Sequence, residues 1–367
     1  MKNRAVTSFD MLEAGQAQGL PLLAEPLLAW YGQNSRALPW REQPEPYWVW
    51  TSEIMLQQTR LNVVLPYFHR FVECLPDIPA LAKAEENLLL KVWEGLGYYN
   101  RVRNMQKAAR IMVEHHSGRL PASYQQLLAL PGIGEYTAGA IASIAYQIPV
   151  PAVDGNVLRV MARLLGCRAD IAQPRVRKTL RAAVEAMLPG ERPGDFNQAM
   201  MDLGAMVCLP HTSPACTLCP LRAMCVGYQE GIADRLPVKS SPKPRAVQQK
   251  TVLVLISQGK TLLRQRPTAG LLAGLWEFPT LDGWLSEENV ALWLNEWGIC
   301  PLSVTRVEES RHVFTHVEWQ MQGYLVYAAD APAVPDGLWV DESAVHAEYA
   351  VPSAFKSFTK HLAQWLE

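Results

Sequence analysis

The chain has 367 residues, 49% of them apolar, so it can bury the cores of two or three domains. Its formal net charge of −1 gives no overall attraction to nucleic acid, so any nucleic-acid binding must depend on local basic patches. No apolar run reaches the roughly 18 residues of a membrane span, and the polar start lacks a signal-peptide core, which argues against a membrane-spanning or secreted protein.

The first 230 residues are predicted to be almost entirely helical. Residues 1–20 read as a polar N-terminal extension, and residues 38–46 as an aromatic loop made rigid by its prolines. Elsewhere apolar residues recur at helical spacing. The predicted helices cover residues 21–31, 49–71 with a break near Pro66, 81–95, 101–115, 124–130, 137–145, 157–165, 175–187 and 196–206.

A Pro-Gly-x-Gly turn joins two of these helices. Gly132 and Gly134 let the backbone turn sharply and lie close to another surface. Bare N–H groups at the start of the second helix make an anion site, which a DNA phosphate would fit. Taken alone, the motif is equally typical of a simple turn between two helices.

Four of the seven cysteines lie within eighteen residues, at Cys208, Cys216, Cys219 and Cys225. Four thiolates on one loop can hold zinc or a 4Fe–4S cluster. Zinc knuckles usually use two pairs with a two-residue gap, and this loop has one such pair. The crowding and the odd total favour metal ligation in a reducing compartment over a disulfide framework. The other cysteines are predicted to be small buried apolar residues: Cys74, Cys167 and Cys300.

The character of the sequence changes after residue 230. Residues 231–249 are predicted to be a basic, proline-rich linker, followed by an α+β domain at 250–367. Short β-branched and apolar runs predict strands at residues 251–257, 261–265, 275–278, 304–311 and 318–327. Helices are predicted at residues 287–297 and 353–365. The chain is therefore expected to be a multidomain protein, with an all-α part followed by an α+β part.

Two carboxylates suit the hydrolysis of a glycosidic bond, whose transition state resembles an oxocarbenium ion. Asp154 follows the glycine hairpin, in a turn with Gly155. Glu53 lies among apolar residues that would desolvate it, raise its pKa and keep it protonated near neutral pH. One group could protonate a leaving base while the other stabilises the sugar cation. Without further information, the favoured interpretation of Glu53 is a solvated or capping residue at a helix start.

Taken in order, these motifs resemble those of the helix-hairpin-helix DNA glycosylases of the endonuclease III class. Leu-Pro-Gly-Ile-Gly is followed about twenty residues later by Val-Asp-Gly-Asn, and Ser-Glu-Ile-Met-Leu-Gln-Gln-Thr resembles the motif of the MutY family of adenine glycosylases. By that resemblance, Glu53 protonates adenine N7 and Asp154 stabilises the cation or traps it covalently. Tyr136 and Asn156 would support the sugar and the water.

Position 136 discriminates within this class. Glycosylases that also cut the strand carry a lysine two residues after the last hairpin glycine, and its amine forms a Schiff base with the sugar. Tyr136 occupies that position here, and a phenol cannot form an imine. The resemblance therefore implies a monofunctional glycosylase that leaves an abasic site.

The resemblance assigns the cysteines to a 4Fe–4S loop, residues 208–225, that closes a catalytic domain at residues 21–230. The family spacing is usually six, two and five residues, whereas the first gap here has seven, which affects Cys208 most. Arg222 would suit a DNA phosphate near this loop. Further arginines are predicted to face phosphates: Arg101, Arg103, Arg159 and Arg163.

Excision requires the base to be flipped out, and a side chain must fill the gap. By the resemblance Tyr98 is the candidate wedge, although it and Leu96 could simply pack beneath a glycine turn. The Gln198 amide can hydrogen-bond adenine bidentately. The residues matched to the adenine pocket are Trp40, Arg41 and Gln198, and those matched to the DNA or the opposite base are Gln58, Thr59, Leu96, Tyr98, Gly132 and Gly134.

The second domain resembles the Nudix-like domain of the same family. A working Nudix hydrolase needs a helix with paired carboxylates that hold magnesium, and residues 281–298 lack that set, so no pyrophosphatase activity is expected. Phe314, Thr315 and His316 match a Phe-Ser-His loop that senses 8-oxoguanine. Thr315 keeps the hydroxyl and adds a methyl group. An ordinary turn at a strand end is the alternative.

The resemblance thus implies an adenine DNA glycosylase that acts on duplex DNA containing 8-oxoguanine:A or G:A. The expected enzyme is a cytoplasmic monomer with a 4Fe–4S cluster and no membrane attachment. One rival is an endonuclease III-like enzyme for damaged pyrimidines, against which Tyr136 and the extra domain argue. A second rival is a DNA-binding scaffold with a dead site, against which the two carboxylates argue.

Overall fold

The computed structural model describes residues 19–210, 213–240 and 244–366, so the predicted N-terminal extension lies almost wholly outside the described residues. The chain divides into two compact units. The helical unit comprises Met1–Phe68, Leu75–Ala82 and Asn104–Ser241, and the sheet unit comprises His69–Cys74, Lys83–Arg103 and Pro242–Glu367. Residues 83–103 therefore belong to the sheet unit, although in sequence they lie within the helical stretch of the chain.

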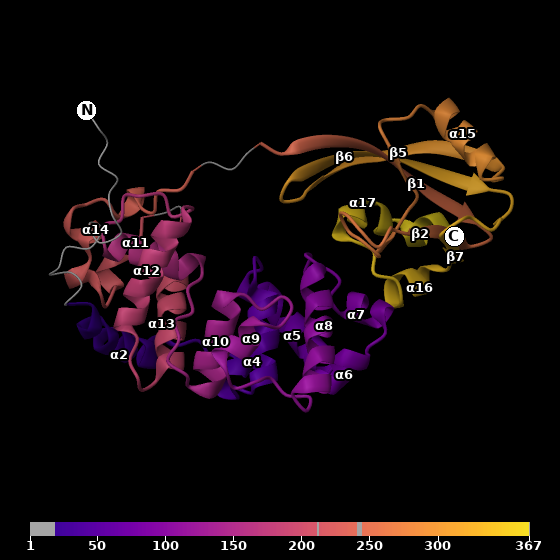
Figure 1. Cartoon of the computed structure of the whole chain (residues 1–367). Helices are drawn as coiled ribbons and strands as arrows, with labels where there is room; N and C mark the ends of the chain where they lie inside the picture. The colour runs from indigo at the N-terminus through magenta and orange to yellow at the C-terminus, as the bar shows by residue number, and fades with distance from the viewer. Residues whose placement is uncertain (1–18, 211–212, 241–243, 367) are drawn as a thin grey trace. The chain divides into compact units, whose positions relative to one another are not determined.

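Helices dominate the described part of the first 230 residues, as predicted (Figure 1). They are η1 (Leu20–Leu23), α2 (Ala24–Asn34), α3 (Pro39–Glu42), α4 (Pro46–Leu56), α5 (Leu61–Cys74), α6 (Ile78–Lys83), α7 (Glu86–Val92), α8 (Asn100–His115), α9 (Tyr124–Leu128), α10 (Glu135–Tyr146), α11 (Gly155–Leu164), α12 (Pro174–Met187) and α13 (Pro193–Met206). The cysteine segment adds η2 (Cys216–Leu218), η3 (Arg222–Met224), α14 (Val226–Gln229) and η4 (Ala233–Arg235).

Two local predictions are wrong in position. The predicted break near Pro66 falls instead between α4 and α5, where Gln58 has φ +59°, and Pro66 lies inside α5. The rigid loop at residues 38–46 contains a short helix, α3, because Pro39 supplies a preset φ at its first position.

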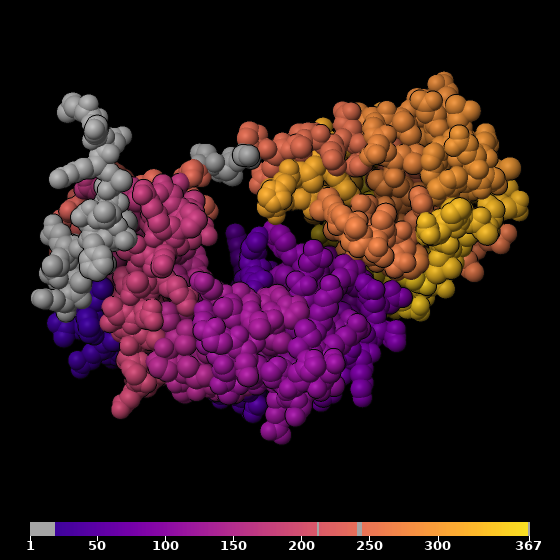
Figure 2. Space-filling view, in the orientation of Figure 1, coloured from indigo at the N-terminus to yellow at the C-terminus, as the bar shows by residue number. Residues whose placement is uncertain are grey.

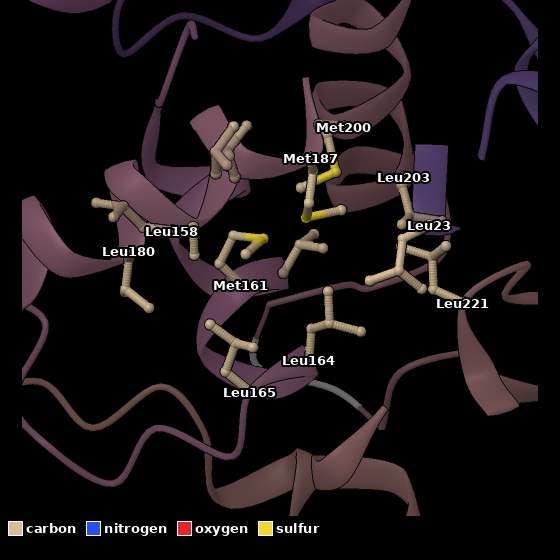
Figure 3. Packing of buried hydrophobic residues seen from close by; sticks show 14 of the residues in the cluster. Leu23, Leu158, Met161, Leu164, Leu165, Leu180, Met187, Met200, Leu203 and Leu221 are labelled. Atoms are coloured by element: carbon tan, nitrogen blue, oxygen red, sulfur yellow. The ribbon is translucent and has the colours of Figure 1, made fainter. Parts of the chain in front are cut away.

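The core that positions α11 and α13 is made mostly of aliphatic and thioether side chains (Figure 3). Leu158, Met161 and Leu164 of α11 pack against side chains of α12 and α13, and all three are at most 9% exposed. Burying a side chain of this size contributes about 1.5–3 kcal/mol. This core therefore fixes the start of α11, where Asp154 lies, against α13.

The described strands of the sheet unit form one mixed sheet with the order β3-β2-β1-β6-β5, in which β4 also pairs with β1 and β7 with β2. β1 and β6 run parallel, and the other pairings are antiparallel. The strands are β1 (Ala246–Ser257), β2 (Lys260–Gln265), β3 (Trp276–Glu277), β4 (Thr280–Asp282), β5 (Pro301–Val313), β6 (Val317–Ala328) and β7 (Gly337–Val340).

Both faces of this sheet are covered, which explains the continuous apolar run in β1. Helix α15 (Glu287–Glu296) packs Val290 and Leu294 on one face. Phe355 and Phe358 pack on the other face from the C-terminal segments. In the space-filling view, the orange surface of the strands adjoins the yellow surface of these later segments (Figure 2).

Several short elements of the sheet unit were not predicted, namely β4, β7 and α16 (Glu342–Ala347). The single helix predicted at residues 353–365 is divided into η5 (Ser353–Phe355), α17 (Lys356–Thr359) and α18 (Leu362–Leu366). The prediction that the isolated cysteines are buried holds for Cys167 and is wrong for Cys74 and Cys300, which are exposed. Within the described residues, no helix combines the length and apolarity needed to span a membrane.

Candidate active site

Glu53 lies in the middle of α4, a helix that is apolar around most of its surface, and the residue is 5% exposed. The hydroxyl of Tyr136, the second residue of α10, donates a hydrogen bond to Glu53 Oε2 at 2.5 Å. The same hydroxyl lies 3.2 Å from Met201 Sδ. Glu53 is therefore a buried residue with a specific partner, and the reading of it as a solvated or capping residue is wrong.

Burial raises the pKa of Glu53 to about 7, because the carboxylate loses water. The hydrogen bond from Tyr136 and the charge of Arg41 oppose this increase in the pKa, while the charge of Asp154 adds to it. Burial likewise raises the pKa of Tyr136 well above its usual range, so its hydroxyl remains a donor. Glu53 can thus hold a proton near neutral pH and give it to a base beside it.

Asp154 is the N-cap of α11. Its Oδ1 accepts from the Val157 N–H at 2.7 Å, and its Oδ2 accepts from Asn156 Nδ2 at 2.8 Å. Burial raises the pKa of Asp154, and these two hydrogen bonds act against that increase. Arg159 Nη2 donates to Asn156 Oδ1 at 2.9 Å, which fixes the orientation of the amide that donates to Asp154.

One open cavity, of about 1500 Å³ including its solvent-filled mouth, collects all of the residues that the sequence proposed for catalysis and for adenine binding. The predicted residues that line it are Trp40, Arg41, Glu53, Gln58, Thr59, Tyr136, Asp154, Asn156 and Gln198. They come from five separate stretches of the chain. The structure therefore brings both carboxylates, the tyrosine and the amide residues to a single site.

Sequence reasoning missed further residues of this cavity, including Arg36, Arg60 and Met201. It also missed Asp202, a fully buried carboxylate that binds Arg36 and Arg41. A signal existed, because Asp202 lies four residues after Gln198 and hence on the same face of α13. An acidic side chain among the apolar residues of this helix pointed to a buried ion pair.

The hairpin glycines lie at the exposed turn before α10. Gly132 has φ +78°, and a Cβ there would lie 2.7 Å from Asn104 Cβ. Gly134 is the N-cap of α10, and apart from its chain neighbours no heavy atom of the described residues lies within 4 Å of the position a Cβ would take. The turn thus leaves its backbone open to a ligand, as the phosphate interpretation requires.

The four clustered cysteines line one small pocket of about 320 Å³ together with Arg163 and Arg222. Arg163 Nη1 lies 3.2 Å from Cys208 Sγ, and burial raises the pKa of the Cys219 thiol to about 11. Among the described residues no three His, Cys, Asp or Glu side chains are grouped closely enough to hold a single metal ion. In a four-iron cluster each thiolate binds a different iron atom, so its ligands stand further apart, and the donor set fits that group.

The prediction that four arginines face phosphates is wrong for the three that are buried. Arg159 and Arg163 are 8% and 3% exposed and donate to backbone carbonyls, including those of Gly204 and Leu236. Arg101 is 9% exposed and donates to the Leu96 carbonyl at 2.9 Å.

The fourth of these arginines, Arg103, is also engaged, because it donates to Glu86 and to the Ala273 carbonyl. Arg222 is exposed, with its guanidinium 5.8 Å from the centre of the Tyr228 ring. Of the five arginines that the sequence suggested for phosphates, Arg222 is the one whose exposure leaves it accessible to DNA.

In the sheet unit, Phe314, Thr315 and His316 form the turn between β5 and β6. The Phe314 ring packs edge-on against Trp319 at 5.0 Å, while Thr315 and His316 are exposed. The Thr315 hydroxyl is 2.9 Å from the Tyr98 hydroxyl. Tyr98 has φ +49°. Its side chain is 48% exposed, so it does not pack beneath its turn.

Leu96, in contrast to Tyr98, is a buried residue, with 5% of its surface exposed. The glycines on either side of it, Gly95 and Gly97, both have positive φ, as expected for a tight turn. Of the two residues matched to the opposite base in this segment, the structure presents Tyr98 at the surface.

Comparison with known proteins agrees with these two units. The model of the HhH-GPD superfamily of base excision DNA repair proteins matches residues 51–186, and the NUDIX domain model matches residues 251–361. An adenine DNA glycosylase from Mus musculus is 35% identical, over 91% of this chain and 77% of the relative.

Two solved structures resemble the helical part of the chain. A thermostable thymine-DNA glycosylase has 26% identity and a TM-score of 0.52, over 58% of this chain and 98% of its own. A trapped endonuclease III–DNA covalent intermediate has 25% identity and a TM-score of 0.50, over 59% of this chain and 98% of its own. The predicted fold class, a helix-hairpin-helix domain followed by a Nudix-like α+β domain, is confirmed.

Proposed function

Because the chain belongs to the family of adenine DNA glycosylases, which hydrolyse the N-glycosidic bond of adenine in DNA, we propose that its substrate is adenine paired with 8-oxoguanine or guanine. The observation that carries the chemistry is the Tyr136–Glu53 hydrogen bond beside Asp154 in one cavity. These three groups supply an acid, its orienting partner and a carboxylate for a cationic sugar.

In the proposed reaction, adenine is flipped out of the duplex into the cavity. Glu53 gives its proton to N7 of the base, which makes adenine a better leaving group as the bond from the sugar carbon to N9 breaks. Asp154 carries negative charge beside the oxocarbenium ion and stabilises it, or bonds to it transiently. Water then adds to the sugar carbon, and its proton returns to the Glu53 carboxylate, so that the products are free adenine and an abasic site.

The amide residues of the cavity suit recognition of the base. Gln198 is 8% exposed and lines the cavity, where its amide can both donate to and accept from the edge of adenine. Trp40 is 4% exposed and packs edge-on against Phe68 at 4.8 Å, so it forms a rigid wall. We assign base selection to these residues together with Arg41.

The absence of a lysine at position 136 supports monofunctional chemistry. The Tyr136 hydroxyl is committed to Glu53, and a phenol cannot form a Schiff base with the sugar. The similar endonuclease III has been trapped as a covalent intermediate with DNA. We propose that this chain instead releases the abasic site without cutting the strand.

We propose that Cys208, Cys216, Cys219 and Cys225 hold a 4Fe–4S cluster, which would order the loop they share and present Arg222 to DNA. We also propose that residues 21–230 carry out excision and that residues 250–367 read the opposite base through Thr315 without pyrophosphatase activity. Support for the second assignment comes from the exposed turn that pairs Thr315 with Tyr98.

A single-turnover assay on a duplex labelled on the adenine strand tests the proposal. With 8-oxoguanine opposite adenine, we expect strand breakage only after an alkali step, and none with thymine opposite adenine. Equal breakage without alkali would show lyase chemistry and contradict the monofunctional assignment. Lack of breakage in both lanes, from protein whose four thiolates are metal-loaded, would overturn the substrate assignment.

A further inference from the structure

Asp202 of α13 is a buried carboxylate that forms ion pairs with two arginines of the cavity wall. Its side chain is fully buried, while those of Arg41 and Arg36 are 12% and 33% exposed. Arg41 forms a two-point contact, with Nη1 to Oδ2 at 2.7 Å and Nη2 to Oδ1 at 3.0 Å. Arg36 Nε donates to Oδ1 at 3.1 Å, and Arg36 Nη2 donates to the same oxygen.

We propose that Asp202 is a positioning residue that holds Arg36 and Arg41 against the cavity and offsets their charge beside Glu53. This inference rests on the proposed role of Glu53 as the acid. Asp202 is not itself among the residues that line the cavity, whereas both arginines are. It therefore acts on the substrate site through them.

The contact with Asp202 fixes the orientation of the Arg41 guanidinium. A two-point contact fixes the plane of a guanidinium as well as its position, so Arg41 cannot swing into the space the base would occupy. Arg41 also lies over the Tyr31 ring at 5.7 Å, which fixes the other side of the group. Its Nε is buried and has no hydrogen-bond partner among the described residues. The guanidinium is anchored by the shorter contacts to Asp202, with a longer bond from Nη1 to the Arg36 carbonyl at 3.4 Å.

The electrostatic consequence concerns the proton on Glu53. A nearby positive charge favours the carboxylate form of Glu53, and Arg41 is such a charge. Asp202 neutralises part of it, which helps Glu53 to stay protonated. Tyr136 of α10 and Asp154 at the start of α11 also act on the Glu53 proton, the first lowering and the second raising the pKa of Glu53. The remaining charged groups that line the cavity are Arg36 and Arg60, in the loops that precede α3 and α5.

The test is the pH dependence of adenine release in single turnover. The wild-type rate should fall as the pH rises through the pKa of Glu53. In Asp202→Asn the uncompensated arginines should move the midpoint of this fall to lower pH by about one unit. Arg41→Gln should move it to higher pH. Opposite shifts from two members of one contact are not expected from a general loss of packing.

A matched control exists on the same helix. Asp195 also belongs to α13 but is 39% exposed in its side chain and pairs with Arg192. Asp195→Asn removes the same charge from α13 and should leave the midpoint at the wild-type pH.

If Asp202→Asn does not fold, as judged by circular dichroism, two other variants test the positioning role of Asp202. Asp202→Glu should keep the wild-type midpoint, since it keeps the charge, with a lower rate from altered arginine geometry; Arg41→Gln should still raise the midpoint. An unshifted midpoint in folded Asp202→Asn, or in Arg41→Gln, overturns the positioning role. Failure of the wild type to release adenine overturns the proposed function instead, so the two failures are distinguishable.

Discussion

Glu53 and Asp154 carry the same functional group but differ in their hydrogen bonds. Glu53 accepts from the Tyr136 hydroxyl inside an apolar helix, whereas Asp154 accepts from a backbone N–H and an amide at a helix start. A helix N-terminus favours an anion, and a buried position without such donors favours a neutral acid. The two environments therefore separate an acid from a charge stabiliser.

Replacement of Glu53 by Gln should abolish the acid while keeping the shape of the side chain. We expect the single-turnover rate of adenine release to fall by about 10²–10⁴-fold, the usual range for a general acid. Binding of the 8-oxoguanine:A duplex, measured by fluorescence anisotropy, should change little. Excision that survives at the wild-type rate would show that Glu53 is not the acid and that another group supplies the proton.

The pH dependence of the wild type follows from the same residue. Because the pKa of Glu53 is raised to about 7, the acid form is present below that pH and is lost above it. The rate at saturating enzyme should therefore be flat below pH 7 and fall about tenfold per pH unit above it. The profile of Glu53→Gln should lack this alkaline limb, and a limb that persisted there would assign the titration to another group.

At the residue scale, the sequence identified the acidic pair but not the charges that support it. Glu53 and Asp154 stand in recognisable motifs, and the cavity does collect them. Arg36 and Asp202 were missed because their contact joins residues 166 positions apart. The phosphate assignment failed for Arg159 and Arg163 because a basic residue on a helix gives no indication of which face will be buried.

At the scale of elements, the close packing of α13 on the start of α11 is what places Asn156. A Cβ at Gly204 would lie 2.7 Å from Asn156 Cβ, and the Gly204 carbonyl accepts from Arg159 Nη2 at 2.8 Å. Only a residue without a side chain allows this approach.

Gly204→Ala should therefore displace Asn156 and, through it, the hydrogen bond to Asp154. Overpacking of this kind costs about 1–3 kcal/mol, more than the roughly 1 kcal/mol that alanine gains in helix propensity. We expect a lower melting temperature and about tenfold slower excision, one decade for 1.4 kcal/mol. Gly32→Ala in α2, where no atom lies within 4 Å, is the control and should be neutral or stabilising. Equal behaviour of the two variants would contradict this account.

Helical spacing predicted the long elements well, because apolar residues at every third or fourth position mark a buried face. Short elements were missed for a physical reason. β4 and β7 have three and four residues and exist because β1 and β2 offer them free edges, which no local pattern records. The position of the α4–α5 break was missed because it depends on the left-handed conformation of Gln58 rather than on Pro66.

At the scale of the whole molecule, the β5–β6 turn meets a segment 217 residues away in sequence through the Tyr98 and Thr315 hydroxyls. Thr315→Val removes one hydroxyl and keeps the shape. We expect the preference for 8-oxoguanine:A over G:A to fall about threefold to tenfold, matching a hydrogen bond of about 0.5–1.5 kcal/mol. The measurement is the ratio of the two single-turnover rates.

Thr315→Ser is the matched control for this change, since it keeps the hydroxyl and removes the methyl group. It should retain the full preference or increase it. If Thr315→Val discriminates as well as the wild type, the hydroxyl has no part in reading the opposite base.

The sheet unit also has a consequence for the order in which the chain is made. Lys91 Nζ donates to the Tyr349 carbonyl at 2.9 Å across 258 residues, and Glu94 accepts from the Val351 N–H at 2.8 Å. At roughly 5–20 residues per second, the ribosome delivers these partners about 13–50 s after the segment at residues 83–103 emerges. Until then the segment at residues 83–103, which carries Tyr98, lacks these partners, so the surface that would read the opposite base is completed only after residue 351 has been synthesised.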